Sequence, residues 1–122
     1  MTRQFDKKHA ETVVATAAIA VNRFVCRAGT HAPAAPAIGN QDSIGISEEA
    51  GAIGEAIPAV THYSYLVETS AAITKGAYLK PAADGSGKAA VGAIGDHCAV
   101  AMTAASAAGQ LVEAQIVKHV HA

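Results

Sequence analysis

The sequence is poor in aromatic and charged residues. Aromatic side chains make up 4% of the 122 residues, tryptophan is absent, and charged residues reach only 16%. An average soluble domain carries roughly 25% charged residues. With a formal net charge of -1, the chain also lacks the basic excess that attracts nucleic acid or an anionic membrane. We therefore expect neither nucleic acid nor a membrane among its partners.

Cysteine is scarce, and long apolar runs are missing. Cys26 and Cys98 match no metal-ligand spacing and form no CxxC pair. A disulfide between them stays open, although buried free thiols of a reduced cytosol fit better. The apolar run 13–21 follows Lys7 and Lys8 and imitates a signal peptide, but no small-residue cleavage site follows it. At about nine residues it is too short to span a membrane, so we expect a soluble protein made in the cytoplasm.

Catalytic motifs are missing from the sequence too. It contains no phosphate-binding loop, nucleophile elbow or HExxH motif. The adjacent acids Glu48 and Glu49 fall in an expected loop and are interpreted as solvated charges. His97 and Cys98 are a candidate nucleophilic couple, but neighbours in a strand point to opposite faces. The chain is therefore not expected to be an enzyme or to bind a cofactor.

Histidine pairs raise the question of a metal site. His119 and His121 would share one face of a strand, a spacing that allows metal binding, and His62 and His97 are candidates to join them. No further ligand is indicated by the sequence, so no metal site is expected.

The residues that are present favour β-structure. Alanine supplies roughly a quarter of the chain and favours helix. However, 11 glycines and 4 prolines cut the region after Ala28 into short pieces. Residues 61–69 and 111–120 alternate with a period of two, and residues 84–87 (Asp-Gly-Ser-Gly) have hairpin-turn chemistry. We predict an all-β fold, a small β-barrel or sandwich.

The two halves of the chain resemble each other. Residues 18–25 parallel residues 72–79, and the similarity continues through a turn region, a short apolar strand, a small-residue turn and a closing strand, at an offset of about 54–56 residues. Alanine bias inflates such a match. Our interpretation is two similar β-units, each too small to bury its own face, that close one barrel together.

The N-terminal segment stands apart from this repeat. We assign residues 1–15 to an extended arm and residues 16–122 to the β-barrel-like domain. The alternative is a frayed terminus. Fifteen extended residues reach roughly 50 Å, enough to contact a neighbouring protein. Candidate contact residues of this arm are Arg3, Gln4, Phe5, Lys7 and Lys8.

The tyrosines are candidates for packing rather than for stacking on a base. We expect Tyr63 and Tyr65 to be largely buried, in the core or between protomers, and place Tyr78 in the same group.

Five segments carry a resemblance to a known family. In order, they are residues 18–25, 45–60, 71–79, 84–89 and 104–117. Their order and spacing resemble those of the small, Ala/Gly-rich head decoration or capsid cement proteins of tailed bacteriophages, over roughly residues 16–117. The polar start, residues 1–11, has no counterpart in that pattern.

The resemblance implies both a fold and a role. The implied fold is a compact β-barrel of the β-tulip or β-clip kind. The implied role is decoration of the outer capsid surface of a virion, as a homotrimer that clamps adjacent major capsid protein subunits. The family offers no catalytic residues. Alternatives are a ligand-binding β-module such as a sugar-binding barrel, a small enzyme or metal protein, and another head, head-fibre or tail subunit.

Overall fold

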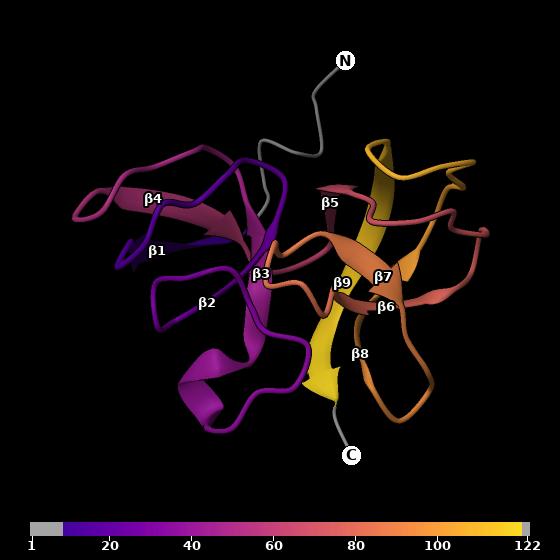
Figure 1. Cartoon of the computed structure of the whole chain (residues 1–122), viewed down its shortest axis with the longest axis horizontal. Helices are drawn as coiled ribbons and strands as arrows, with labels where there is room; N and C mark the ends of the chain where they lie inside the picture. The colour runs from indigo at the N-terminus through magenta and orange to yellow at the C-terminus, as the bar shows by residue number, and fades with distance from the viewer. Residues whose placement is uncertain (1–8, 121–122) are drawn as a thin grey trace.

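The computed structural model describes residues 9–120, and within them all regular structure except one short helix is strand (Figure 1). A first unit contains β1 (Ala10–Val14), β2 (Phe24–Cys26), the 3-10 helix η2 (Gly39–Gln41), β3 (Ser43–Ser47) and β4 (Ala56–Val60). A second unit contains β5 (Ser64–Glu68), β6 (Tyr78–Pro81), β7 (Ala89–Val91), β8 (His97–Ala101) and β9 (Leu111–Val120). The predicted all-β fold is confirmed. No helix among residues 9–120 has the length and apolar content needed to cross a membrane.

The two units have the same topology. The first sheet has the strand order β1-β4-β3-β2, and the second has β5-β9-β8-β6-β7. Strands β1 and β5 begin at residues 10 and 64, β2 and β6 at 24 and 78, and β3 and β8 at 43 and 97, an offset of 54 residues each time. Strands β4 and β9 begin at 56 and 111, an offset of 55. The prediction of two similar β-units is confirmed.

The equivalence extends to individual backbone pairs. An isolated bridge joins Ile19 to Gly51 in the first unit, and its counterpart joins Ile73 to Ala105 in the second. Val13 lies opposite Ile57 in the first sheet, and the equivalent residues Val67 and Val112 lie opposite each other in the second. Because the offset stays at 54 or 55 residues in strands, loops and isolated bridges, the two units have the same fold and not merely a similar composition.

Each unit buries an equivalent set of small and branched side chains. In the first unit the set is Val13, Ile19, Val25, Ile57 and Ala59, and in the second it is Val67, Ile73, Leu79, Val112 and Ala114. All ten are at most 3% exposed. Burial of each of the larger ones contributes roughly 1.5–3 kcal/mol. The outer face of the first sheet adds Phe24 and Ile46 to the core of the second unit, so one continuous cluster joins the two.

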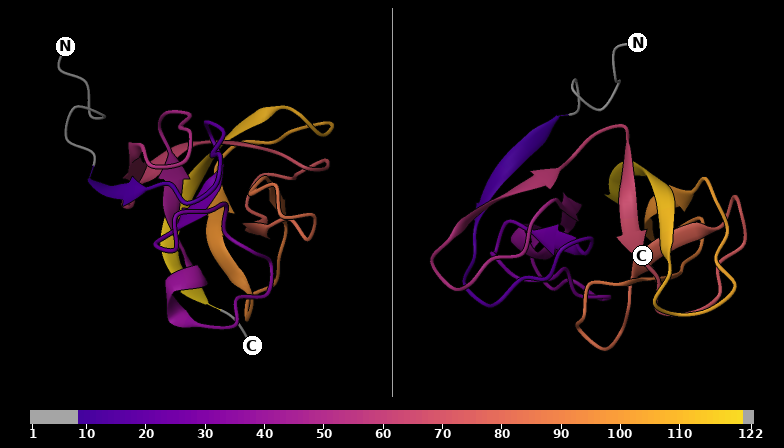
Figure 2. Two further views of the ribbon diagram at one scale, coloured as in Figure 1. Left: turned by 60° about the vertical axis from the view of Figure 1, so that its left-hand side comes forward. Right: turned by 90° about the horizontal axis from the view of Figure 1, so that it is seen from above.

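The two sheets lie side by side and do not close into a barrel, so that expectation is wrong (Figures 1 and 2). Closure would require an edge strand of one sheet to pair along its length with an edge strand of the other. The two units instead share the larger buried cluster, the first unit keeps a smaller one of its own, and β1, β2, β5 and β7 remain edges. The halves meet where β3 runs beside β9.

The structure also moves the boundary predicted at residue 15. Residues 10–14 form β1, which pairs antiparallel with β4 from Ala10 opposite Val60 to Val14 opposite Ala56. Val13 is buried on this strand and Val14 is exposed, the alternation of an edge strand with one face in the core. Residues 1–8 of the predicted arm lie outside the described residues.

The strands of the second unit follow the sequence patterns closely. The predicted strand 111–120 is β9, and the turn at residues 84–87 connects β6 to β7 with positive φ at Gly85 and Gly87. The predicted strand 61–69 is shorter in the structure, because β5 begins at Ser64 and Tyr63 takes a left-handed φ of 68°.

We predict that Gly45→Ala destabilises the fold by about 1–3 kcal/mol, because the added Cβ would overlap the carbonyl oxygen of Val60 on β4. Gly95→Ala is the matched control, since nothing lies within 4 Å of a Cβ there. Urea unfolding of both variants checks this. Equal stability of the two would contradict the close approach of β3 and β4.

Candidate functional site

The junction between the two units is built on Asn22, the residue that precedes Arg23 and β2. Asn22 has a left-handed φ of 61°, which asparagine tolerates better than most residues. Its carbonyl oxygen accepts a hydrogen bond from the backbone N–H of Glu68 (2.9 Å), and its Nδ2 donates to the carbonyl oxygen of Leu66 (2.9 Å). One residue of the first unit therefore satisfies two outward-facing groups on the edge of β5.

Arg23 adds a charged clamp to this junction. Its Nη1 donates to the carbonyl oxygen of Ser86 (2.9 Å), and its Nη2 pairs with Oε1 of Glu68 (3.1 Å). Lys88 approaches the other carboxylate oxygen of Glu68 at 3.4 Å. Burial raises the pKa of Glu68, but its bonds to Arg23 and Lys88 outweigh this and leave the pKa below its usual value. The carboxylate thus stays charged where the units meet.

His31 lies beneath the turn that connects β6 and β7. Its Nε2 accepts a hydrogen bond from the backbone N–H of Ala20 (3.0 Å), so the ring is neutral in the fold. Burial lowers the pKa of His31, the nearby Arg23 guanidinium lowers it further, and a hydrogen bond to the backbone of Gly85 opposes them in part. His31 therefore links a loop of the first unit to a turn of the second.

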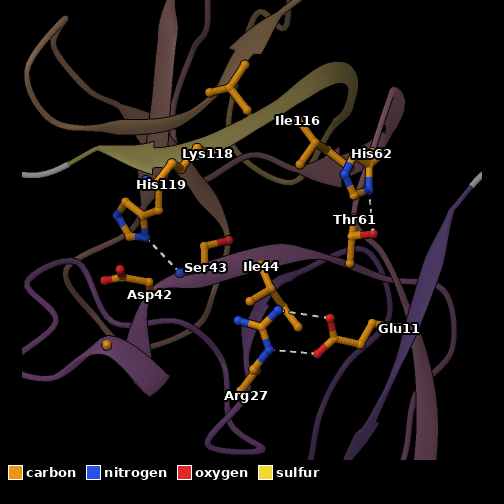
Figure 3. A pocket seen from close by; sticks show the side chains of 12 residues that line it. Glu11, Arg27, Asp42, Ser43, Ile44, Thr61, His62, Ile116, Lys118 and His119 are labelled. Carbon is orange, nitrogen blue, oxygen red and sulfur yellow. Dashed lines mark hydrogen bonds and ion pairs between the residues drawn. The ribbon is translucent and has the colours of Figure 1, made fainter.

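A shallow pocket of about 350 Å³ opens between the units, beside β1, β3 and β9 (Figure 3). On one wall the guanidinium of Arg27 makes two bonds to the carboxylate of Glu11 (2.8 and 3.0 Å). On another, the backbone N–H of Ser43 donates to Nδ1 of His119 (2.7 Å). His62 faces the pocket from the linker between β4 and β5. Arg27, Glu11 and His119 on these walls therefore already bond to groups of the chain itself.

The candidate nucleophile is not activated. Cys98 is 1% exposed, and burial raises the pKa of its thiol to about 12. The ring of His97 lies instead against Tyr78, with ring centroids 4.6 Å apart, and its Nδ1 is 3.0 Å from the carbonyl oxygen of Ala93. Cys26 and Cys98 are both buried free thiols, as expected, with no disulfide between them.

The histidines do not assemble into a metal site within the described part of the chain. No group of three or more His, Cys, Asp or Glu side chains able to hold a metal is found among residues 9–120. His62 and His119 line the same pocket, whereas His97 does not, and His121 lies outside the described residues.

The tyrosines fall in three different environments. Tyr63 is 63% exposed, so it does not lie in the core of the chain, and its placement between protomers stays a prediction. Its ring lies edge-on to His9 at 5.4 Å. Tyr65 is half-buried against the main core cluster. Tyr78 is half-buried beside His97. The arm candidates Arg3, Gln4, Phe5, Lys7 and Lys8 lie outside the described residues.

Sequence reasoning missed the junction residues. Aligned by the repeat, Asn22 and Arg23 stand where the second unit has Gly76 and Ala77. This difference is a signal in the sequence: the first unit has a polar and a charged residue where the second has two small ones. Such a difference indicates a contact that only the first unit makes.

We expect Arg23→Met to lower the free energy of unfolding by about 1.5–3 kcal/mol, because it leaves the carbonyl of Ser86 and part of the Glu68 carboxylate without their partner. Arg27→Met is the matched control. Arg27 also pairs with a glutamate, but its side chain is 59% exposed and the pair lies within the first unit, so about 0–1 kcal/mol is expected. Chemical denaturation measures both, and equal losses would refute the clamp.

Stability should fall in mild acid because of His31. Its folded-state pKa lies below the 6.5 of the free side chain, so the unfolded chain takes up the proton first as the pH drops. The stabilisation that neutral His31 gives to the folded state is complete above about pH 6.5. It is lost as the pH falls below that value towards the folded-state pKa. Urea titrations across this range should show a steeper loss for the wild type than for His31→Gln, with His62→Gln as the exposed control. Parallel curves for wild type and His31→Gln would contradict the assignment.

Comparison with known proteins gives a fold and no family. No protein-family model matches the sequence, and no curated protein matches it. Among solved structures, the chain is similar to the crystal structure of the N base of head fiber gp8.5 of bacteriophage phi29, with a TM-score of 0.62 and 16% sequence identity. The match covers 93% of this chain and 98% of that one. The two therefore share a fold across nearly their whole lengths.

Proposed function

We propose that this chain is a structural protein of a phage head, one that binds the outer capsid surface and stabilises it between major capsid protein subunits. The observation that carries the proposal is the fold shared with the N base of a phage head fiber, over 93% of this chain. The order of the five sequence segments that resemble decoration proteins points to the same part of a virion.

The construction of the fold suits such a role. Two units share a buried cluster and are bonded through Asn22 and Arg23, which favours one stiff body over two loosely tethered ones. Several polar groups at the pocket and the junction bond to one another, among them Arg23 with Glu68 and Arg27 with Glu11. A protein that binds at many equivalent sites on a shell needs only modest affinity per copy, because multivalency supplies the rest.

The exposed tyrosine and the sheet edges are the proposed contact surfaces. Tyr63 and His62 of the linker between the units form an aromatic group with His9, which precedes β1. Exposed tyrosines are favourable in interfaces, where they bury a large area at little conformational cost. We assign this group to the contact with the capsid or with other protomers of a homotrimer.

A second candidate is the base of a head fibre, favoured because the similar structure is itself a head fiber base. The two candidates differ in stoichiometry. A decoration protein should saturate a shell at a ratio fixed by its lattice, whereas a fibre base should occupy a smaller set of sites. Titration of purified shells with labelled protein, followed by sedimentation, distinguishes them. Failure to co-sediment with any shell would remove both.

The N-terminal arm is proposed as part of the capsid contact, and its test must spare β1. Removal of residues 2–8 leaves Glu11 and its bond to Arg27 in place, so thermal stability should be unchanged. Occupancy on shells should fall by roughly tenfold or more if the arm adds a few main-chain hydrogen bonds to a neighbour. Unchanged occupancy would confine the capsid contact to residues 9–122. Alanine at Thr74 and Lys75, both exposed, is a control that leaves the N-terminus intact.

A further inference from the structure

The junction between the two units is asymmetric. The first unit contributes Asn22 and Arg23, and the second contributes the edge of β5 and the turn at residues 84–87. Each unit has both kinds of surface, but the junction uses only the Asn22 surface of the first unit and the β5 edge of the second. The second unit therefore keeps its own version of the Asn22 surface, and the first unit keeps its own version of the β5 edge.

The chemistry of the β5 edge explains why Asn22 binds there. The backbone N–H of Thr69 donates inward, to the carbonyl oxygen of Gln110 just before the neighbouring strand β9. Because alternate residues of a strand point their backbone groups to opposite sides, Leu66 and Glu68 face outward. The C=O of Leu66 and the N–H of Glu68 are the groups that Asn22 bonds.

The equivalent groups on β1 are Thr12 C=O and Val14 N–H. The backbone N–H of Ala15 donates to the carbonyl oxygen of Glu55, on the β4 side, just as that of Thr69 donates to Gln110. Because backbone groups alternate along a strand, the N–H of Val14 and the C=O of Thr12 point away from β4. Within residues 9–120, no hydrogen bond to either outward group is found. Val14 is also 58% exposed, an apolar side chain on an edge strand. Such an edge is a ready acceptor of another chain.

The equivalent of Asn22 in the second unit is Gly76, and it has the same pose. Its φ of 87° is close to the 61° of Asn22. Its N–H donates to Ala101 (2.8 Å), as that of Asn22 donates to the equivalent Ser47 (2.9 Å). Gly76 is exposed, and a Cβ built on it meets nothing within 4 Å. Its surroundings are therefore open to a partner.

We propose that a second copy of this chain docks head to tail on β1, with Gly76 of one copy bonded to Val14 of the next as Asn22 is bonded to Glu68 within the chain. Where the intrachain junction has the Arg23–Glu68 ion pair, the contact between copies places Ala77 against Val14. It is therefore apolar and weaker than the intrachain one. Repetition of such a contact gives a closed ring or an open chain, according to the rotation between copies. This inference does not depend on the proposed function.

Sedimentation velocity of the purified full chain over a range of concentrations is the test, with Val14→Pro as the disrupting variant. Proline removes the outward N–H without breaking a hydrogen bond to β4, and proline is tolerated on edge strands. Self-association should weaken by roughly tenfold or more, while the melting temperature stays close to that of Val14→Ala, which keeps the N–H.

Gly76→Asn provides the opposite change. It restores the side-chain amide that Asn22 uses on Leu66, now aimed at the C=O of Thr12. Self-association should become roughly threefold to tenfold tighter through one added hydrogen bond. A wild-type chain that stays monomeric at every concentration would overturn the proposal. So would self-association that neither Val14→Pro nor Gly76→Asn alters, since the contact would then lie on another surface.

Discussion

The edge of β5 is the constraint on which this structure depends. A strand at a sheet edge exposes N–H and C=O groups that need partners, and Asn22 supplies partners for two of them. The left-handed turn at Asn22 sets the start of β2, which places Phe24 in the shared core and Arg23 beside Glu68. A single short segment thus converts two small β-units into one body with a continuous apolar cluster.

Much of the fold could be predicted from local pattern. The alternation of β9, the Asp-Gly-Ser-Gly turn and the offset between the halves are encoded in neighbouring residues, and all three are present. The barrel could not be excluded, because closure depends on how edges pair across units, which composition does not encode. Tyr63 fits a strand by propensity, but its left-handed φ turns the chain between the units and exposes its ring. The junction residues carry no local motif, because an isolated Asn-Arg pair has none, and only the comparison of the two repeats distinguishes Asn22 and Arg23 from Gly76 and Ala77.

The fold explains why the sequence is rich in alanine. Ala59 and Ala114 occupy equivalent, fully buried strand positions, where larger side chains would overpack the core. Small side chains contribute little apolar burial each, so the fold relies on many close backbone approaches such as that of Gly45 to β4. A protein built in this way gains from being held against a larger surface, which agrees with a place on a phage head and with association between copies.

The most direct test of the central claim is quantitative mass spectrometry of gradient-purified phage particles from cells that produce this chain, measured against the major capsid protein. We expect the chain to stay with the particles through purification, at a fixed ratio set by the symmetry of the shell. Its absence from intact particles, or an amount that varies freely between preparations, would contradict a structural role on the head.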